Sequence, residues 1–258
     1  VTKTAVATGA DLVAYSGFTQ SNYLQQPYNS DLDFGTGDFS YSMWFKKSSA
    51  DTAILLHRSA TKTSDGNWNT SGPVHQVEFN GSSLIMQIYA QGFTSNTGYI
   101  VLDDAPYINN NWMNLTWVRR SGNHYAYING KLEGTGVSPN TATNTSAELW
   151  IGNRPTFNDR PFADGSIALF RASATAPSPE QIAKIYNDEK HLFQDGAQAT
   201  LYGSSDAVTA LGHDDTTDLL HVGTSAGRSV FQGLRRVDNT TDAITAAISA
   251  SNGLVAEE

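Results

Sequence analysis

The chain has 258 residues, a formal net charge of -9 and a sequence pI of about 5.0. This acidic balance argues against a nucleic-acid groove, which needs a basic surface. The absence of cysteine excludes a disulfide framework and thiol chemistry, and no stretch approaches the roughly 20 apolar residues of a membrane span.

Short apolar or alternating stretches separated by turn residues predict an antiparallel β domain over most of the chain. The expected strands lie at 11–15, 22–26, 38–45, 53–57, 74–79, 83–89, 99–102, 115–119, 125–128, 147–152 and 165–171. Asn80-Gly81 and Asn129-Gly130 are hairpin turn pairs. In 38–45 the side chains alternate, with Trp44 on one face and four large apolar side chains on the other: Phe39, Tyr41, Met43 and Phe45.

A single helix is predicted after the last of these strands, at 178–190. Ser178 fits an N-cap, Pro179 fits the first helical position, and Gln181 completes a capping box. The apolar stripe expected to dock on a sheet consists of Ile182, Ile185 and Tyr186.

Several of these motifs occur in an order that resembles laminin-G-like, concanavalin-type jelly-roll domains. They are the strand 38–46, Trp112 with the hairpin 115–131, the Leu-x-Ile-Gly strand 147–152, and Ser-Pro-Glu-x-Ile at 178–182. The resemblance covers about residues 10–192 and implies a two-sheet antiparallel sandwich. Family members often carry an acidic residue where this chain has Ala168, so the resemblance does not support a calcium ion at that position.

The pattern of the sequence changes at about residue 194. Strands expected at 206–211, 218–224 and 228–231 resemble a β-propeller blade, and the opening of the first recurs 36 residues later at 242–247. The alternative is that this recurrence is a coincidence in a sequence rich in alanine and threonine. Because the pattern changes at about residue 194, we divide the chain into a jelly roll, 1–193, and a small β-rich oligomerisation module, 194–258.

No catalytic constellation is visible in the sequence. Concanavalin-type glucanases use a Glu-x-Asp-x-x-Glu strand with two carboxylates beside the scissile bond, and this run is absent here. The histidines lack ligand partners at short spacing, and the serines lack a nucleophile elbow. These observations predict a protein that is not an enzyme, and no cofactor is required.

Sugar sites combine a flat aromatic side chain with planar polar groups. Two loops with this chemistry contain the candidate ligand-binding residues Asn67, Trp68, Asn69, Asn153, Arg154, Phe157, Asn158 and Arg160. The alternative is that Trp68 only packs on the core and holds its loop there. The other tryptophans are expected in the core or the sheets: Trp44, Trp112, Trp117 and Trp150.

Calcium takes six to eight oxygen ligands, which loop carboxylates and carbonyls supply. Asp33, Asp159 and Asp164 are the candidate calcium ligands, because each lies in a loop between expected strands.

The C-terminal module also resembles segments of tail and fibre proteins of bacterial viruses. This resemblance implies a virion structural protein, a tail fibre or capsid appendage, whose jelly roll attaches to host-surface glycans or serves particle assembly. The expected location is the surface of the particle. The expected partners are copies of the chain in a trimer, other virion proteins and a glycan, without nucleic acid or membrane insertion. The alternatives are a secreted bacterial carbohydrate-binding or adhesion protein, and a polysaccharide lyase or glycosidase on the same fold.

Overall fold

A computed structural model shows a chain that divides into two compact units, Val1–Asp195 and Gly196–Glu258. The structure describes residues 1–7, 10–60, 73–89, 99–137, 142–154, 160–194, 208–225, 227–232, 235–241, 249–251 and 254–256. Within these residues, no helix is long and apolar enough to cross a membrane.

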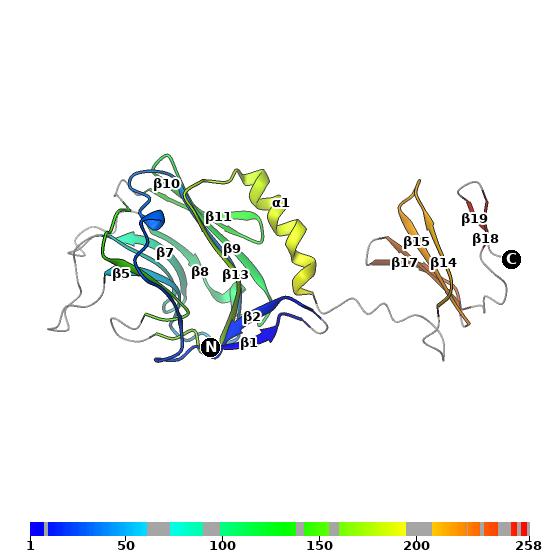
Figure 1. Ribbon diagram of the computed structural model, residues 1–258, viewed down its shortest axis with the longest axis horizontal. Helices are drawn as coiled ribbons and strands as arrows, with labels where there is room; N and C mark the ends of the chain where they lie inside the picture. The colour runs from blue at the N-terminus through cyan, green and yellow to red at the C-terminus, as the bar shows by residue number, and fades with distance from the viewer. Residues whose placement is uncertain are drawn as a thin grey trace. The chain divides into compact units, whose positions relative to one another are not determined.

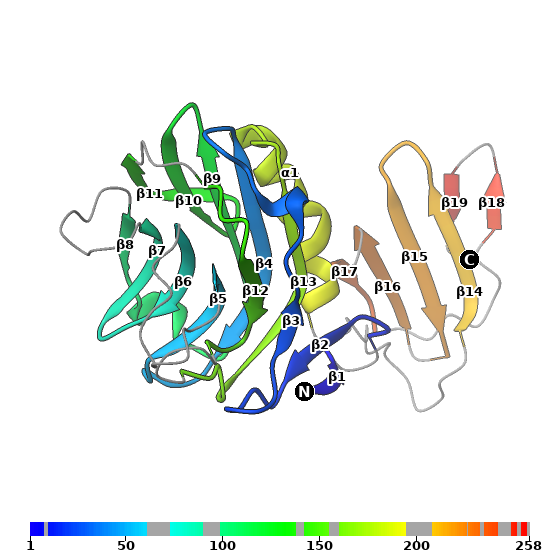
Figure 2. The ribbon, with the colours of Figure 1, turned by 60° about the vertical axis from the view of Figure 1, so that its left-hand side comes forward.

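The described part of the first unit contains two antiparallel sheets that pack face to face (Figures 1 and 2). One sheet has the order β1 (Thr2–Ala5), β2 (Val13–Ser16), β13 (Gly165–Ser173), β4 (Phe39–Lys47), β9 (Met113–Arg120), β10 (Asn123–Ile128), β11 (Lys131–Val137). The other has the order β3 (Leu24–Gln26), β12 (Ala147–Ile151), β5 (Ala53–Ala60), β6 (Val74–Phe79), β7 (Ser83–Tyr89), β8 (Tyr99–Asp103). The predicted two-sheet antiparallel jelly roll is therefore confirmed.

The core between the sheets follows the predicted alternation along β4. Four side chains of this strand are fully buried in the core, namely Phe39, Tyr41, Met43 and Phe45. The prediction for the tryptophans is also confirmed, because Trp44, Trp117 and Trp150 are buried and Trp112 packs partly buried against the cluster around Trp44.

Helix α1 (Pro179–Glu189) covers the outer face of the seven-stranded sheet (Figure 1). Ser178 is its N-cap, and both hydrogen bonds of the predicted capping box with Gln181 are present. Trp44 stacks on Tyr186, with ring centroids 5.7 Å apart, and its indole N–H donates to Glu189 at 2.7 Å. Ile182 is buried as predicted, but Ile185 is 38% exposed, so the apolar stripe is narrower than the sequence indicated.

The described part of the first unit also contains three short 3-10 turns: η1 (Ser30–Leu32), η2 (Ala105–Tyr107) and η3 (Lys190–Phe193). The strand β1 was not predicted, because Thr2–Ala5 is exposed along its whole length and has no apolar pattern.

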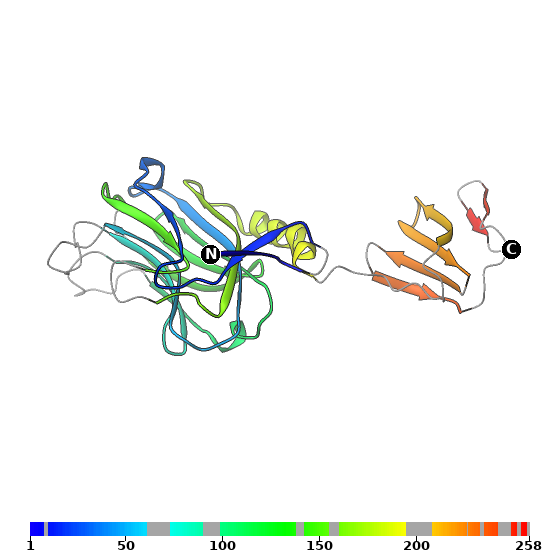
Figure 3. The same cartoon turned by 60° about the horizontal axis from the view of Figure 1, so that its bottom comes forward.

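The described part of the second unit is a four-stranded antiparallel sheet and a separate hairpin (Figure 3). The sheet runs in chain order through β14 (Val208–Asp214), β15 (Leu219–Thr224), β16 (Gly227–Gln232) and β17 (Arg235–Asn239). The hairpin consists of β18 (Ser249–Ser251) and β19 (Leu254–Ala256). The predicted repeat of the opening strand, at 242–247, lies outside the described residues.

Candidate functional site

A pocket opens at one side of the sandwich, where the edges of the two sheets do not meet. β3 is the edge strand of the six-stranded sheet and has only three residues, paired to β12 through Leu24–Ile151 and Gln26–Leu149. In the seven-stranded sheet, β2 pairs with β13 only at Ser166 and Ile167. Beyond Ile167 the outer side of β13 has no strand neighbour among the described residues, so the interior between β12 and β13 is open there.

The pocket has a volume of about 320 Å³ and an apolar interior. Leu149 and Ile151 are each 5% exposed, and the polar residues of the lining are Gln25, Gln26 and Asn29. The Gln25 amide itself donates to Glu148 at 2.7 Å. The complete lining is Leu24, Gln25, Gln26, Asn29, Leu32, Leu149, Ile151, Phe170 and Ala172. None of these side chains is charged, so the pocket suits a neutral ligand that has both an apolar surface and hydrogen-bonding groups.

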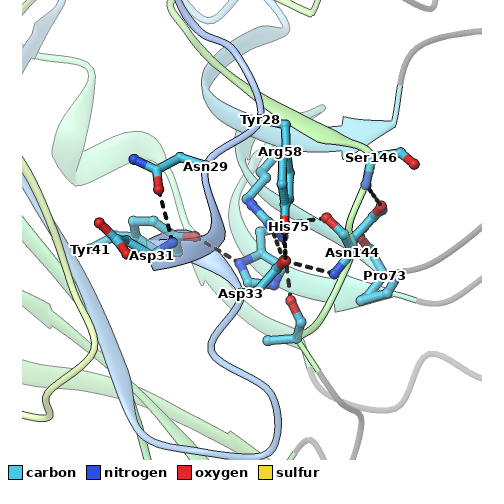
Figure 4. A network of polar contacts seen from close by, with 11 residues as sticks. Tyr28, Asn29, Asp31, Asp33, Tyr41, Arg58, Pro73, His75, Asn144 and Ser146 are labelled. Carbon is cyan, nitrogen blue, oxygen red and sulfur yellow. Dashed lines mark hydrogen bonds and ion pairs between the residues drawn. The ribbon is translucent and has the colours of Figure 1, made fainter.

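The loop 27–37 forms one wall of the pocket through Asn29 and Leu32, and Asp33 fixes this loop to the core (Figure 4). One carboxylate oxygen of Asp33 pairs with the Arg58 guanidinium and accepts from the Asn144 backbone N–H at 2.9 Å. The other oxygen accepts from the Tyr28 hydroxyl at 2.9 Å. Burial alone would raise the pKa of Asp33, but the hydrogen bonds from Asn144, Arg58 and Tyr28 outweigh it and lower this pKa.

Arg58 connects this loop with the segment that precedes β12. Its side chain is fully buried and also donates to the backbone carbonyls of Ala142 at 3.3 Å and Asn144 at 3.2 Å. The Ala142 N–H in turn donates to the Gly35 carbonyl at 2.6 Å. The pocket wall is thus held by one buried guanidinium that bridges two loops.

Buried histidines and arginines lie side by side on both sheets near this guanidinium. Arg58 is the cross-strand neighbour of His75, and Arg119 is the cross-strand neighbour of His124. Burial, together with the charge of Arg119, lowers the pKa of His124 to about 4. Burial, with Arg58 as the next cause, holds the pKa of His75 well below its ordinary value, so both imidazoles are neutral at pH 7.

Arg154 is part of a buried polar row on the outer face of the six-stranded sheet. It is 4% exposed, and its guanidinium donates to Gln76 Oε1 at 3.0 Å. The same Gln76 oxygen lies 2.8 Å from His57 Nδ1, and the His57 ring stacks on Trp150. The Arg154 side chain is therefore held in this row by Gln76, and its role as a ligand-binding residue stays a prediction.

Asn153 and Arg160 hold the two ends of their loop. Asn153 donates to the Thr19 carbonyl at 3.2 Å and accepts from the Arg160 N–H at 3.1 Å. The Arg160 guanidinium pairs with Glu78 at 3.0 Å. Both residues therefore have structural partners, and their role as ligand-binding residues stays a prediction.

Five of the eight predicted ligand-binding residues lie outside the described residues. They are Asn67, Trp68, Asn69, Phe157 and Asn158. Their part in binding likewise stays a prediction.

The candidate calcium ligands have cationic partners where the structure describes them. Asp33 pairs with Arg58, as above, and Asp164 pairs with Lys47 at 2.8 Å and accepts from the Ser49 N–H at 2.7 Å. Asp159 lies outside the described residues. Each of the two described carboxylates is thus neutralised by a buried cation, and no group of three metal-binding side chains occurs in the described part of the chain.

Sequence reasoning missed the pocket residues. Leu24, Gln25 and Gln26 were expected only as a strand, and Phe170 only as part of the closing strand. No local signal marks them, because they meet only through the pairing of β3 with β12 and the position of β13 in the other sheet.

Comparisons with known proteins agree with this architecture. The family model described as "Concanavalin A-like lectin/glucanases superfamily" matches residues 18–183. The binding domain of Paraclostridial Mosquitocidal Protein 1 is similar, with 12% identity, a TM-score of 0.54, and coverage of 95% of this chain and 61% of that one. The botulinum neurotoxin serotype D binding domain gives 13% identity and a TM-score of 0.50, covering 89% of this chain and 55% of that one.

These likenesses show the fold, and the chain spans less than two thirds of either domain. A search of curated protein sequences finds no match.

Proposed function

Because the chain belongs to the concanavalin A-like lectin/glucanase superfamily, we propose that its first unit binds a carbohydrate in the pocket between β3, β12 and β13. The single observation that carries this proposal is the lining of the pocket. Aliphatic side chains and Phe170 offer surface for the C–H groups of a sugar ring, and the lining residues Gln26 and Asn29 carry amide groups of the kind that bind hydroxyls.

The chemistry of the lining favours a neutral sugar. A carboxylated or sulfated sugar gains most from an arginine or lysine in its site, and no charged side chain lines this pocket. A volume of about 320 Å³ lies at the lower end of the range for small-ligand sites, roughly 300–1,000 Å³. We therefore expect one sugar unit to enter, such as a hexose or an N-acetylhexosamine.

Binding without cleavage is the form of this function that the geometry favours. Glycosidases place two carboxyl groups about 5–9.5 Å apart on either side of the scissile bond. No carboxylate lines the pocket. Among the described residues of the first unit, the carboxylates of Asp33, Glu78 and Asp164 pair with arginine or lysine. Glu189 does so as well.

The proposal is tested by titrating the full chain with a panel of neutral and anionic oligosaccharides in a calorimeter. Binding of at least one neutral member, without release of reducing ends on long incubation, supports it. Binding of anionic members only would refute the choice of pocket. Release of reducing ends would show that the protein cleaves the sugar and does not only bind it.

We also propose the wider setting, a virion appendage such as a tail fibre in which the first unit contacts the host surface or other virion proteins. The support for this setting is the resemblance of the C-terminal sequence to segments of tail and fibre proteins of bacterial viruses. Mass spectrometry and immunogold labelling of purified particles test it. A protein found only in a bacterial culture supernatant would favour the secreted adhesin instead.

A further inference from the structure

The closing strand β13 contains a β-bulge where it borders the pocket. Its residues pair with β4 up to Ala168 and again from Arg171. Between these two pairs, Leu169 and Phe170 lie opposite the single residue Met43 of β4. The pairing of β13 with β2 ends directly before this point. The bulge therefore coincides with the uncovered edge at which the pocket opens.

Leu169 has a backbone conformation that a bulky side chain rarely adopts. Its φ is +48°, in the left-handed region, where the β-carbon is crowded by the following carbonyl oxygen. The other described residues with a positive φ, glycine aside, are asparagine, serine or aspartate, whereas a branched apolar residue is an outlier there. Backbone strain of this kind persists only where the surrounding structure holds it, and it is concentrated at functional sites.

The bulge decides which side chains of β13 face the pocket. Ile167 lies in the core between the sheets. Because side chains alternate along a regular strand, the next inward positions would be Leu169 and Arg171. Instead, Phe170 and Ala172 pack against this core and line the pocket. The extra residue thus exchanges the two sets of side chains.

The side chains that the bulge keeps out of the pocket lie on the outer face of the sheet. Arg171 pairs with Glu189 of helix α1 at 2.7 Å, and Leu169 packs against the cluster around Trp44. With regular alternation, the arginine would bring a cation into a pocket whose lining has no charged side chain. The bulge therefore makes this wall of the pocket aromatic and neutral.

Phe170 is supported by an immobile ring on its core side. Its ring stacks on that of Tyr41, with centroids 6.3 Å apart and planes inclined by 26°. Tyr41 is fully buried, and its hydroxyl lies 2.9 Å from Nδ1 of the fully buried His75. A ring held by packing in this way is suited to contact the C–H face of a sugar.

We propose that Leu169 is a positioning residue of the sugar site, which turns Phe170 into the pocket as the platform for the sugar ring and keeps Arg171 out. This role rests on the proposed function, the binding of a neutral sugar in this pocket. It adds that the ligand is a pyranose ring that lays an apolar C–H face on Phe170.

Calorimetric titration and fluorine NMR of the full chain labelled with fluorophenylalanine test this role together. The sugar is the neutral member of the panel that binds the unchanged chain most tightly, and the signal missing from Phe170→Leu identifies the Phe170 resonance. We expect the sugar to shift this resonance. We also expect Phe170→Leu to bind roughly tenfold more weakly.

Two substitutions of Leu169 separate its backbone conformation from its side chain. Leu169→Ile keeps the size but adds a β-branch, which disfavours the left-handed region, whereas Leu169→Gly permits it. Leu169→Ile should bind roughly tenfold more weakly and lose the shift of the Phe170 resonance, and Leu169→Gly should bind within about threefold of the unchanged chain. Leu12→Ile is the matched control, because Leu12 packs against the same cluster and has no positive φ.

The outcomes distinguish the role of Leu169 from sugar binding itself. If the sugar binds without moving the Phe170 resonance, or if Leu169→Ile binds as well as Leu12→Ile, the role of Leu169 is refuted and sugar binding stands. If no sugar of the panel binds the unchanged chain, both are refuted. Should circular dichroism show that Leu169→Ile does not fold, Leu169→Gly decides, because a loss of its binding would also overturn the proposal.

Discussion

Arg58 of β5 and Asp33 of the 27–37 loop form an ion pair in which the arginine side chain is fully buried and the aspartate is 11% exposed. The pair fixes the loop that supplies Asn29 and Leu32 to the pocket. The wall of the candidate sugar site therefore depends on a contact between two segments 25 residues apart.

Removing the charge of Asp33 should destabilise the fold and weaken sugar binding together. Asp33→Asn leaves the Arg58 guanidinium buried without its carboxylate, a change that typically costs about 3 kcal/mol or more. Urea unfolding and calorimetric titration measure the two effects. Asp188→Asn is the control, because its pair with Lys184 is exposed and such helix pairs contribute about 0.3–0.5 kcal/mol. Equal stability of the two variants would contradict the anchoring role of Asp33.

Stability should fall as the pH decreases from about 6.5 towards 4.5. In the folded chain burial lowers the pKa of His57 to about 3 and that of His124 to about 4, from 6.5, and holds that of His75 well below 6.5. The unfolded chain takes up protons below pH 6.5 while the folded chain does not, so this contribution to stability is complete above that pH and is lost below it.

Urea unfolding between pH 7.5 and 4.5 measures this effect. The lowered pKa values of Asp33 and Asp164 act below about pH 5. The raised pKa values of His213 and Asp104 act with the opposite sign, above 6.5 and near the acidic end of the range. The slope between about pH 6.5 and 5 therefore reports the buried histidines. A free energy of unfolding that is constant across this window would show that they are not buried in the neutral form.

A side chain at Gly152 should destabilise the fold more than one at another glycine with positive φ. The φ of Gly152 is +81°, and a Cβ there would lie 2.1 Å from the ring of the fully buried Phe18. Gly81 has a similar φ of +65° with no atom within 4 Å of the corresponding Cβ position, which makes it a matched control for backbone strain. We expect Gly81→Ala to cost about 1 kcal/mol and Gly152→Ala about 1–3 kcal/mol more. Similar unfolding midpoints would refute the packing argument.

Arg154→Ala should lower the melting temperature, whereas the same substitution at an exposed loop residue would leave it nearly unchanged. The substitution removes the hydrogen bond to Gln76 from a buried polar row, and losses of this kind cost about 1–3 kcal/mol. Lys131→Ala, at a side chain that is 80% exposed, should leave the melting temperature within about a degree. If the two variants have the same melting temperature, the Arg154 side chain has no structural role.

The sequence predicted the features that depend on neighbouring residues. The Asn129-Gly130 turn has φ values of +52° and +77°, as its chemistry required, and the capping box of Ser178 and Gln181 is complete. The alternation in β4 likewise identified the four side chains that pack between the two sheets.

The features that the sequence did not reveal depend on residues far apart in the chain. The pocket forms because β3, β12 and β13 come from distant segments and leave an edge uncovered. Arg154 belongs to a loop that the sequence marked as a candidate ligand site, but its guanidinium donates to Gln76, a residue 78 positions away. Edge gaps and contacts of this range have no local sequence pattern.

Filling the pocket tests the proposed site most directly. Ala172 lines it, and Ala174 lies two residues further on at an exposed position, so Ala172→Leu and Ala174→Leu add the same side chain inside and outside. Calorimetric titration with a neutral oligosaccharide that binds the unchanged chain should show at least a tenfold weaker affinity for Ala172→Leu, with Ala174→Leu unaffected and both melting temperatures retained. An unchanged affinity of Ala172→Leu would contradict the account, because the sugar would then bind elsewhere.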